Sequence, residues 1–576
     1  MNQKLENILN VSLDATEDEL RKADSLSTGY NWRDNTWEII VKYSGSLESI
    51  RNRYNVYIKE LLNYYAIIVA DKATIELISQ EDVIDYVEKP KSLYYQIERT
   101  KTAACVGSVR ADGNILSGKG VIVGVIDTGI DIFDNAFRNS DGTTRILNIY
   151  DQTTGEKYDK QSIDEYIRLN EDLSGGTFSY DNAPGVDNIM HGTDVSYIAA
   201  GSLGVAYEAD IIAVKMGYSI NNQFPRTTSL MDAIDYIIRK AIEYRKPVAV
   251  NISYGCNYGA HNGNTLLESF IDDISKSYRC VICVGSGNEA DKAIHFGGII
   301  NTGQVQTAYL SVGEYQSAID IQIWKNYWDT IDVMLINPRG EQIGIITEGR
   351  INRYETYNTE IITLLGEPSP YNIYQEIYIN LIPKTEYILS GIWQIVLMAG
   401  SIRAGEYNIW LPSSQALGYA TAFNNPTADG TITIPATARN CIAVGAYNAY
   451  TNSYAAFSGR GFDNSIRNVN AGVKPDITAP GVHISIARQR GNDITYRNVT
   501  GTSYAVPVVT GAAALLMQWG IVMGNDRFMY GEKLKAALID GSKPVGLVGI
   551  TRNDNQPDPR TGWGAVCLKN TLNKIL

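Results

Sequence analysis

The sequence has few cysteines, and it lacks both long hydrophobic runs and an apolar leader. Six cysteines in 576 residues are too few for the disulfide framework of a secreted protein. No run of about 18 apolar residues occurs, which argues against a membrane-spanning helix. Residues 1–10 do not combine a basic start with an apolar core, so we expect no secretory signal peptide. These absences predict synthesis and folding in a reducing cytoplasm.

The chain also lacks an excess of positive charge and a clear set of metal ligands. Its net charge of −13 argues against nucleic acid or an anionic membrane as the main partner. Cys280 and Cys283 form a C-x-x-C, but residues three apart on a strand point to opposite faces, which favours buried core thiols over a metal or redox pair. Acidic loops such as Asp554–Asp558 are too generic to indicate calcium. No metal and no cofactor is therefore assigned.

The length is sufficient for about two to four domains. Between Trp37 and Glu88 the pattern alternates strand, helix, strand, helix and strand, which predicts a small α+β domain with both helices on one sheet face. A short capped helix is expected before it. From Val121 onward, continuous apolar runs alternate with amphipathic helices, which predicts an α/β domain with a doubly wound parallel sheet.

Residues from about 299 to 420 interrupt the α/β pattern with alternating runs such as Ala318–Trp324 and no convincing helix. Short strands separated by turn residues predict an all-β sandwich inserted into the α/β domain. The predicted boundaries are 1–96 for the first domain, 97–298 for the first part of the α/β domain, 299–425 for the insert and 426–576 for the second part.

Three segments carry residues suited to nucleophilic catalysis. Gly501-Thr502-Ser503 precedes a long apolar helical run, so Ser503 would stand at the positive end of a helix dipole. Pro507 would lie in the first turn, where its missing N–H costs no hydrogen bond. Asp127 directly follows an apolar strand, and His191 opens a helix at His191-Gly-Thr-Asp. Each residue taken alone has a structural alternative. Asp127 could be a helix cap, His191 a packed structural histidine, and the segment with Ser503 a turn or a helix cap. Together they supply nucleophile, base and carboxylate.

Two kinds of candidate binding group accompany these residues. Asn288 ends the strand-to-loop segment Val284–Asn288, and its amide would either cap a turn or donate to an oxyanion together with the Ser503 N–H. Two segments at strand ends are candidates for binding an extended peptide as an added strand. They consist of Ser253, Tyr254 and Gly255, and of Gly285, Ser286 and Gly287.

The segments Asp127-Thr-Gly, His191-Gly-Thr and Gly501-Thr-Ser503 resemble the three signatures of the subtilisin-like serine proteases, or subtilases. The resemblance spans about residues 97–570, interrupted by the insert. It implies a serine endopeptidase with Asp127, His191 and Ser503 as its triad and Asn288 in its oxyanion site.

Two residues depart from the family pattern. Asp194 stands where a second histidine is usual in His-Gly-Thr-His, and Tyr504 replaces the customary methionine after the nucleophile. Neither position transfers a proton, so we expect altered packing rather than lost activity.

Among subtilases, the chain most resembles the Csp germination proteases of spore-forming clostridia. The features that carry this resemblance are a β insert after Asn288, the run Asn251–His261 and the missing signal peptide. They imply a ferredoxin-like prodomain over 1–96 that lies in the cleft, and a jelly-roll insert. They also imply storage in the spore and cleavage of the zymogen of a cortex-degrading hydrolase at germination.

Other functions stay open. Some Csp proteins lack triad residues and act as pseudoproteases, so a germination sensor that only binds its signal is one alternative. A general intracellular subtilase is another, although the insert and the retained prodomain argue against it. For the insert, structural support is favoured over binding of carbohydrate or a partner protein, because the sequence identifies no exposed aromatic platform.

Self-cleavage is predicted near Gln96–Ile97, at the end of the extended tail Leu93–Ile97. N-terminal sequencing of the purified protein should find Ile97 first, whereas the Ser503→Ala variant should stay intact. An intact chain from a preparation whose Ser503 is competent would mean that this tail is a plain linker.

Overall fold

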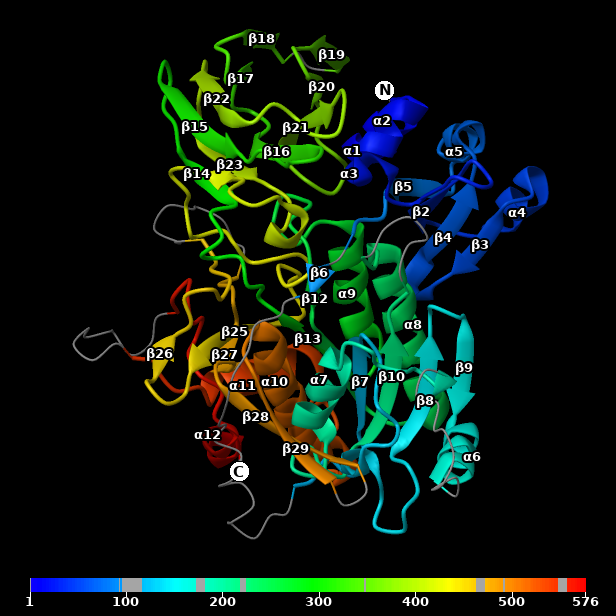
Figure 1. The fold of residues 1–576 in the computed structure, drawn as a ribbon. Coiled ribbons are helices and arrows are strands. Elements are labelled where there is room, and N and C mark those ends of the chain that lie inside the picture. The colour runs from blue at the N-terminus through cyan, green and yellow to red at the C-terminus, as the bar shows by residue number, and fades with distance from the viewer. Residues whose placement is uncertain are drawn as a thin grey trace.

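The computed structural model describes residues 2–92, 94–95, 116–171, 182–217, 224–346, 349–462, 472–490, 493–546 and 557–575. The predicted cleavage residues Gln96 and Ile97 lie outside them. The chain forms an N-terminal domain, an α/β domain and a β-rich insert that lies above the α/β domain in Figure 1.

A nine-stranded sheet forms the centre of the α/β domain. Its parallel strands follow the order β25 (Ile442–Asn448), β13 (Cys280–Gly285), β11 (Val248–Ile252), β7 (Ile122–Asp127), β10 (Asp210–Lys215) and β8 (Ile146–Asp151). β27 (Ile477–Pro480) pairs in parallel with β25, while β9 (Glu156–Asp159) and β26 (Ser453–Tyr454) are antiparallel edge strands. The predicted parallel sheet is confirmed, although β8 and β9 were not predicted.

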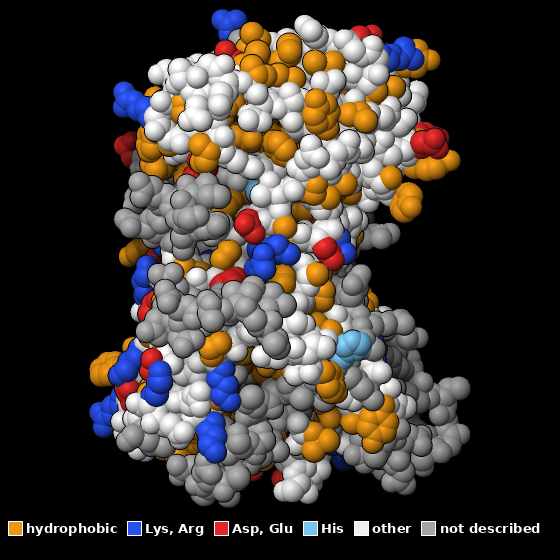
Figure 2. Space-filling model, turned by 90° about the vertical axis from the view of Figure 1, so that its left-hand side faces the viewer, with side chains coloured by type: hydrophobic (Ala, Val, Ile, Leu, Met, Phe, Trp, Pro, Cys, Tyr) orange, Lys and Arg blue, Asp and Glu red, His pale blue; other side chains and the backbone are white. Residues whose placement is uncertain are grey.

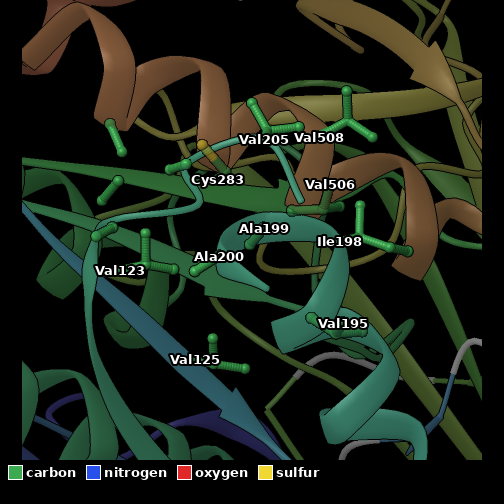
Figure 3. Close-up of a cluster of buried hydrophobic side chains, with 14 of the residues drawn as sticks. Val123, Val125, Val195, Ile198, Ala199, Ala200, Val205, Cys283, Val506 and Val508 are labelled. Atoms are coloured by element: carbon green, nitrogen blue, oxygen red, sulfur yellow. The ribbon is translucent and has the colours of Figure 1, made fainter. Parts of the chain in front are cut away.

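Helices cover both faces of this sheet. α7 (His191–Ala200) and α10 (Thr502–Met517) pack on one face, and α8 (Thr227–Tyr244) and α9 (Leu266–Ser277) on the other. Val123 and Val125 of β7 join the first core, shown in Figure 3, while Ile122 joins the second. Cys283 lies in the first core and Cys280 in the second, so the two thiols point to opposite faces as predicted. α6 (Lys160–Glu171), α11 (Gly531–Asp540) and α12 (Leu568–Ile575) are further helices in the described part of the domain.

The helix that carries Ser503 lies deep in the core. Together with the following π-helical turn it spans Thr502–Val522, which is long and apolar enough to cross a membrane by length and composition. However, 83% of its apolar window is buried in the protein, which is the position expected for a helix that is hydrophobic all round. Because the helix begins at Thr502, Pro507 lies in its second turn rather than in the predicted first turn.

The N-terminal domain contains an antiparallel sheet in which β5 (Ile84–Glu88), β2 (Thr36–Tyr43), β4 (Tyr65–Ala70) and β3 (Tyr57–Glu60) are neighbours in that order. β1 (Tyr30–Asn31) also pairs with β2. α4 (Glu48–Tyr54) and α5 (Lys72–Ile78) pack on one face, as predicted. The expected capped helix is α2 (Glu17–Lys22), with a capping box at Thr16. α1 (Asn7–Asp14) and α3 (Asp24–Ser27) were not predicted.

The insert consists of two antiparallel sheets. One contains β14 (His295–Ile299), β23 (Glu406–Trp410), β16 (Ile319–Asn326), β21 (Tyr374–Pro383), β20 (Thr359–Leu365) and β19 (Ile351–Glu355). The other contains β18 (Gln342–Ile345), β17 (Ile331–Ile336), β22 (Gly391–Ala399), β15 (Val305–Val312) and β24 (Ala422–Phe423). Because β14 pairs with β23, the insert begins at His295 rather than at the predicted residue 299.

The N-terminal domain contacts both other parts of the chain. Ile40 and Ile67, on the sheet face opposite α4 and α5, share a core with α8 and α9. The N-terminal helices share another core with Tyr378 and other residues of the insert. Arg353 of β19 adds ion pairs of 2.9 Å with Asp14 and with Glu19.

The insert also has a large exposed apolar surface, and Figure 2 shows hydrophobic side chains spread over the upper part of the molecule, which the insert forms. Tyr419 is 99% exposed and Tyr315 is 74% exposed. Individually exposed tyrosines do not make an aromatic platform, so these exposures do not test the expected supporting role. The contacts with the N-terminal helices are the structural evidence for a supporting role.

Buried charges join the N-terminal domain to the α/β domain. The ammonium of Lys91 contacts the carboxylates of Glu6, at 2.7 Å, and of Glu88. Glu88 also accepts a hydrogen bond of 2.8 Å from the Leu266 N–H at the start of α9. Burial raises the pKa of Glu88 to about 7, although the charge of Lys91 acts against this. Burial lowers the pKa of Lys89, which donates to the N-terminal domain, to about 7.

We predict that Lys91→Met, made in a Ser503→Ala background to prevent cleavage, destabilises the protein by about 3–5 kcal/mol near pH 8, because the buried carboxylate of Glu88 and the partly buried one of Glu6 lose their cation. The pKa of Glu88 is raised by folding, so its stabilising effect is present in acid and is lost as the pH rises through about 7. The loss in melting temperature should therefore be larger at pH 8 than at pH 5. Lys89→Met is the matched control and should cost less; equal losses for Lys91→Met at both pH values would contradict the prediction.

Candidate active site

Asp127 and His191 form a buried pair between a strand and a helix. Asp127 ends β7, and His191 is the first residue of α7. Oδ1 of Asp127 lies 2.6 Å from Nδ1 of His191, and the carboxylate also accepts a hydrogen bond of 2.8 Å from the Thr128 N–H. Both side chains are 2% exposed or less. The imidazole is therefore oriented through Nδ1, so Nε2 is the nitrogen suited to act as a base.

The close contact between these two segments requires a glycine after the histidine. A Cβ at Gly192 would lie 2.3 Å from the Gly129 carbonyl oxygen and 2.9 Å from Cβ of Asp127. The N–H of Gly192 donates to Oγ1 of Thr128 at 2.9 Å. The glycine of the His-Gly-Thr signature thus lets α7 approach the end of β7.

Asp187, which the sequence analysis missed, connects the same segments. Its carboxylate accepts hydrogen bonds from Thr128 Oγ1 at 2.7 Å and from the Met190 N–H at 2.7 Å. It also accepts from the N–H and the hydroxyl of Thr193 at 2.8 and 2.7 Å. A fully buried carboxylate needs such donors, and here they fix the backbone on both sides of His191. The available signal was an aspartate four residues before the histidine.

The pKa of His191 is raised above its ordinary value. Burial acts to lower it, but the charge of Asp127, the hydrogen bond with Asp127 and the charges of Asp194 and Asp187 outweigh burial. A raised pKa makes the imidazole a stronger base. It also means that, as the pH falls, His191 becomes protonated and the enzyme loses activity at a higher pH than with an ordinary histidine.

Ser503 lies in the first turn of α10, which packs against α7. The ring of its neighbour Tyr504 lies 5.3 Å from the ring of His191, and Tyr504 is 1% exposed. The tyrosine that stands where methionine is usual thus packs against the ring of His191 in this chain. The predicted nucleophile therefore stands near the N-terminus of a helix whose next residue contacts the ring of the predicted base.

Asn288 is fixed by the same helix. Its Oδ1 accepts hydrogen bonds from the N–H and from Oγ1 of Thr502, at 3.1 and 3.0 Å. These bonds orient the amide, and its Nδ2 is buried without a hydrogen-bond partner in the described part of the chain. A buried, oriented donor next to Ser503 is suited to an oxyanion that forms there.

The segment after the N-terminal domain runs along the α/β domain as an extended strand. The carbonyl of Lys91 accepts a hydrogen bond from the Thr227 N–H, and the Lys91 N–H donates to Oγ1 of Thr227. Ser92 forms a β-bridge with Arg226. β6 (Tyr94–Tyr95) then pairs antiparallel with β12 (Tyr254–Gly255). The predicted peptide-binding edge at residues 253–255 thus carries a peptide strand of the chain itself.

At the second predicted edge, residues 285–287, the backbone groups of Ser286 and the carbonyl of Gly287 are already paired. The N–H of Ser286 donates to β25, and its carbonyl accepts a hydrogen bond of 3.0 Å from the Thr433 N–H. The carbonyl of Gly287 accepts from the Gly459 N–H at 2.8 Å. Because loops of the α/β domain already occupy these groups, the prediction of an added strand here is wrong. The segment instead leads the chain to Asn288.

Comparisons with known proteins identify relatives of both the N-terminal domain and the α/β domain. Residues 118–368 and 404–564 match the subtilase family, and residues 3–91 match the Csp protease B prodomain. The structure of the CspB protease of Clostridium perfringens is similar at 34% identity and a TM-score of 0.74, covering 82% of this chain and 96% of that chain. The subtilase-type proteinase RRT12 of Saccharomyces cerevisiae is 33% identical over 128 residues, which are 22% of this chain and 23% of that protein.

The chain therefore belongs to the subtilase family of serine endopeptidases. Within this family it carries a Csp protease B prodomain, and it is similar over most of its length to the C. perfringens CspB protease.

We predict that Asn288→Ala slows self-cleavage about 10²–10³-fold, a magnitude taken from the asparagine of subtilisin itself rather than from this geometry. The rate can be followed by the appearance of the shorter product during cell-free synthesis of the full chain. Thr502→Val is the matched control: it removes one bond to Asn288 but keeps the backbone N–H donor, so it should slow cleavage far less. Cleavage of Asn288→Ala at the wild-type rate would show that this amide does not contact the oxyanion.

Proposed function

We propose that this subtilase removes its own prodomain by cleavage at Gln96–Ile97 and then activates the zymogen of a spore cortex hydrolase during germination. The observation that carries the proposal is the pairing of the prodomain tail, at Tyr94–Tyr95, with β12 in the domain that holds the triad residues. A chain that presents its own tail to its peptide-binding edge has the arrangement needed for self-cleavage.

In the proposed mechanism, Oγ of Ser503 attacks the scissile carbonyl while Nε2 of His191 accepts the hydroxyl proton. His191 later gives this proton to the leaving amine. Asp127 keeps the other imidazole proton on Nδ1 and stabilises the imidazolium that forms. Asn288 Nδ2 and the Ser503 N–H donate to the oxyanion.

The proposal includes the finer assignments of architecture and location. The strand order β5-β2-β4-β3 with two helices on one face supports a ferredoxin-like prodomain, and the paired antiparallel sheets support a jelly-roll insert. Storage in the spore and the cortex-hydrolase substrate rest on the similarity to the CspB protease and on the Csp prodomain match. The buried contacts of the prodomain with α9 and the insert support its retention after cleavage.

A pseudoprotease that only senses a germination signal is the rival function. The Asp127–His191 hydrogen bond and the oriented Asn288 amide favour hydrolysis, because a sensor needs neither.

Incubation with a candidate cortex-hydrolase zymogen tests the proposal. We expect the wild type to shorten the zymogen and to generate hydrolase activity, whereas Ser503→Ala should do neither. Ser202→Ala, which removes an exposed hydroxyl, is the matched control and should behave as wild type. Two results would contradict this function. One is cleavage of the zymogen by Ser503→Ala, and the other is a zymogen that stays intact with wild-type protein that has cleaved itself.

A further inference from the structure

One carboxylate near the base has partners that the family pattern does not predict. Asp194 lies on α7 one turn after His191 and is fully buried. It forms ion pairs with Arg488 and, at 3.2 Å, with Arg497. The arginines come from a hairpin of β28 (Ile484–Arg490) and β29 (Asp493–Val499).

The hairpin register places both arginines on one face. Arg497 lies directly opposite Ile486, and Ile486 and Arg488 are two residues apart on the same strand. Ile486 is fully buried in the core that contains α7. The face of the hairpin that packs on the α/β domain therefore presents two guanidinium groups to a single carboxylate.

Arg488 also fixes the backbone next to the base. Its guanidinium donates a hydrogen bond of 2.9 Å to the carbonyl of Met190, the residue before His191. Met190 has a φ of +67°, a left-handed conformation that needs support in a residue other than glycine. The N–H of Met190 donates to Asp187 at 2.7 Å, so hydrogen bonds hold both the N–H and the carbonyl of this residue.

We infer that Asp194, held between Arg488 and Arg497, is a positioning residue for His191, because it anchors the first turn of α7 to the β28–β29 hairpin and supplies part of the negative charge around the imidazole. The inference rests on the proposed roles of His191 and Ser503. In this chain the Asp194 cluster occupies the place where a second histidine is usual.

The charged groups around His191 come from several elements, and their signs predict in which direction each substitution shifts the pKa of His191. Burial acts to lower the pKa of His191, and the carboxylates of Asp127, Asp194 and Asp187 act to raise it. The groups concerned are Asp127 from β7, Asp187 from the loop before α7, Asp194 from α7, Arg488 and Arg497 from the hairpin, and Tyr504 from α10. Removing a negative charge should make His191 easier to deprotonate, and removing a positive charge should make it harder.

The test measures the rate at which a fluorophosphonate labels Ser503 in the full-length protein as a function of pH. The reagent phosphonylates the Ser503 hydroxyl with loss of fluoride and of a proton to His191, so its rate follows the neutral imidazole. For Asp194→Asn we expect the midpoint of the acid limb to move down by roughly half a pH unit, and for Arg497→Gln we expect a smaller upward movement. Arg497 is partly exposed, so its variant keeps the test valid if Asp194→Asn fails to fold.

Asp540→Asn, which breaks an exposed ion pair with Lys574, is the control and should leave the midpoint unchanged. A purely structural role would slow labelling without moving the midpoint in opposite directions, and that result would overturn the inference while leaving the proposed function intact. A folded wild type that is never labelled at Ser503 would overturn the proposed function itself.

Discussion

The hydrogen bond between Asp127 and His191 is the contact on which the site depends. It joins two segments that are 64 residues apart in sequence and that meet where β7 ends and α7 begins. A buried carboxylate and a buried imidazole would each be costly alone, but as a hydrogen-bonded pair they compensate one another. The network around Asp187 holds the backbones on which both groups are carried, so the geometry exists before any substrate binds.

The prodomain packs on the side of the α/β domain opposite to α7 and α10. Its sheet packs on α8 and α9, on the face away from α7 and α10, and its tail crosses to reach β12. The domain can therefore remain docked through contacts that do not involve the cleft. The buried ion pair between Lys91 and Glu88 lies where the domain ends and the tail begins, so it connects the docked domain with the tail that pairs with β12.

The sequence patterns pointed to candidate residues with specific chemistry. They missed Asp187, which acts through hydrogen bonds, and the arginines that form ion pairs with Asp194. Asp127, His191, Ser503 and Asn288 could be proposed because each lies in a segment that combines a reactive side chain with a glycine or a strand end. Asp187 was missed because an isolated aspartate in a loop carries no periodic signal. The pairing of the β28–β29 hairpin with Asp194 depends on contacts about 300 residues apart, which no local pattern contains. The strand edge at 285–287 was mispredicted because its hydrogen-bond partners lie beyond the insert.

The central claim is that Asp127 keeps the proton of the neutral imidazole on Nδ1 of His191. Nitrogen NMR with ¹⁵N-labelled histidine measures this directly, and single substitutions can assign the signals because the chain has four histidines. We expect the neutral side chain of His191 to carry its proton on Nδ1 in the wild type and in Ser503→Ala, and to lose this preference in Asp127→Asn. A wild-type His191 that carries its proton on Nε2 would contradict the account.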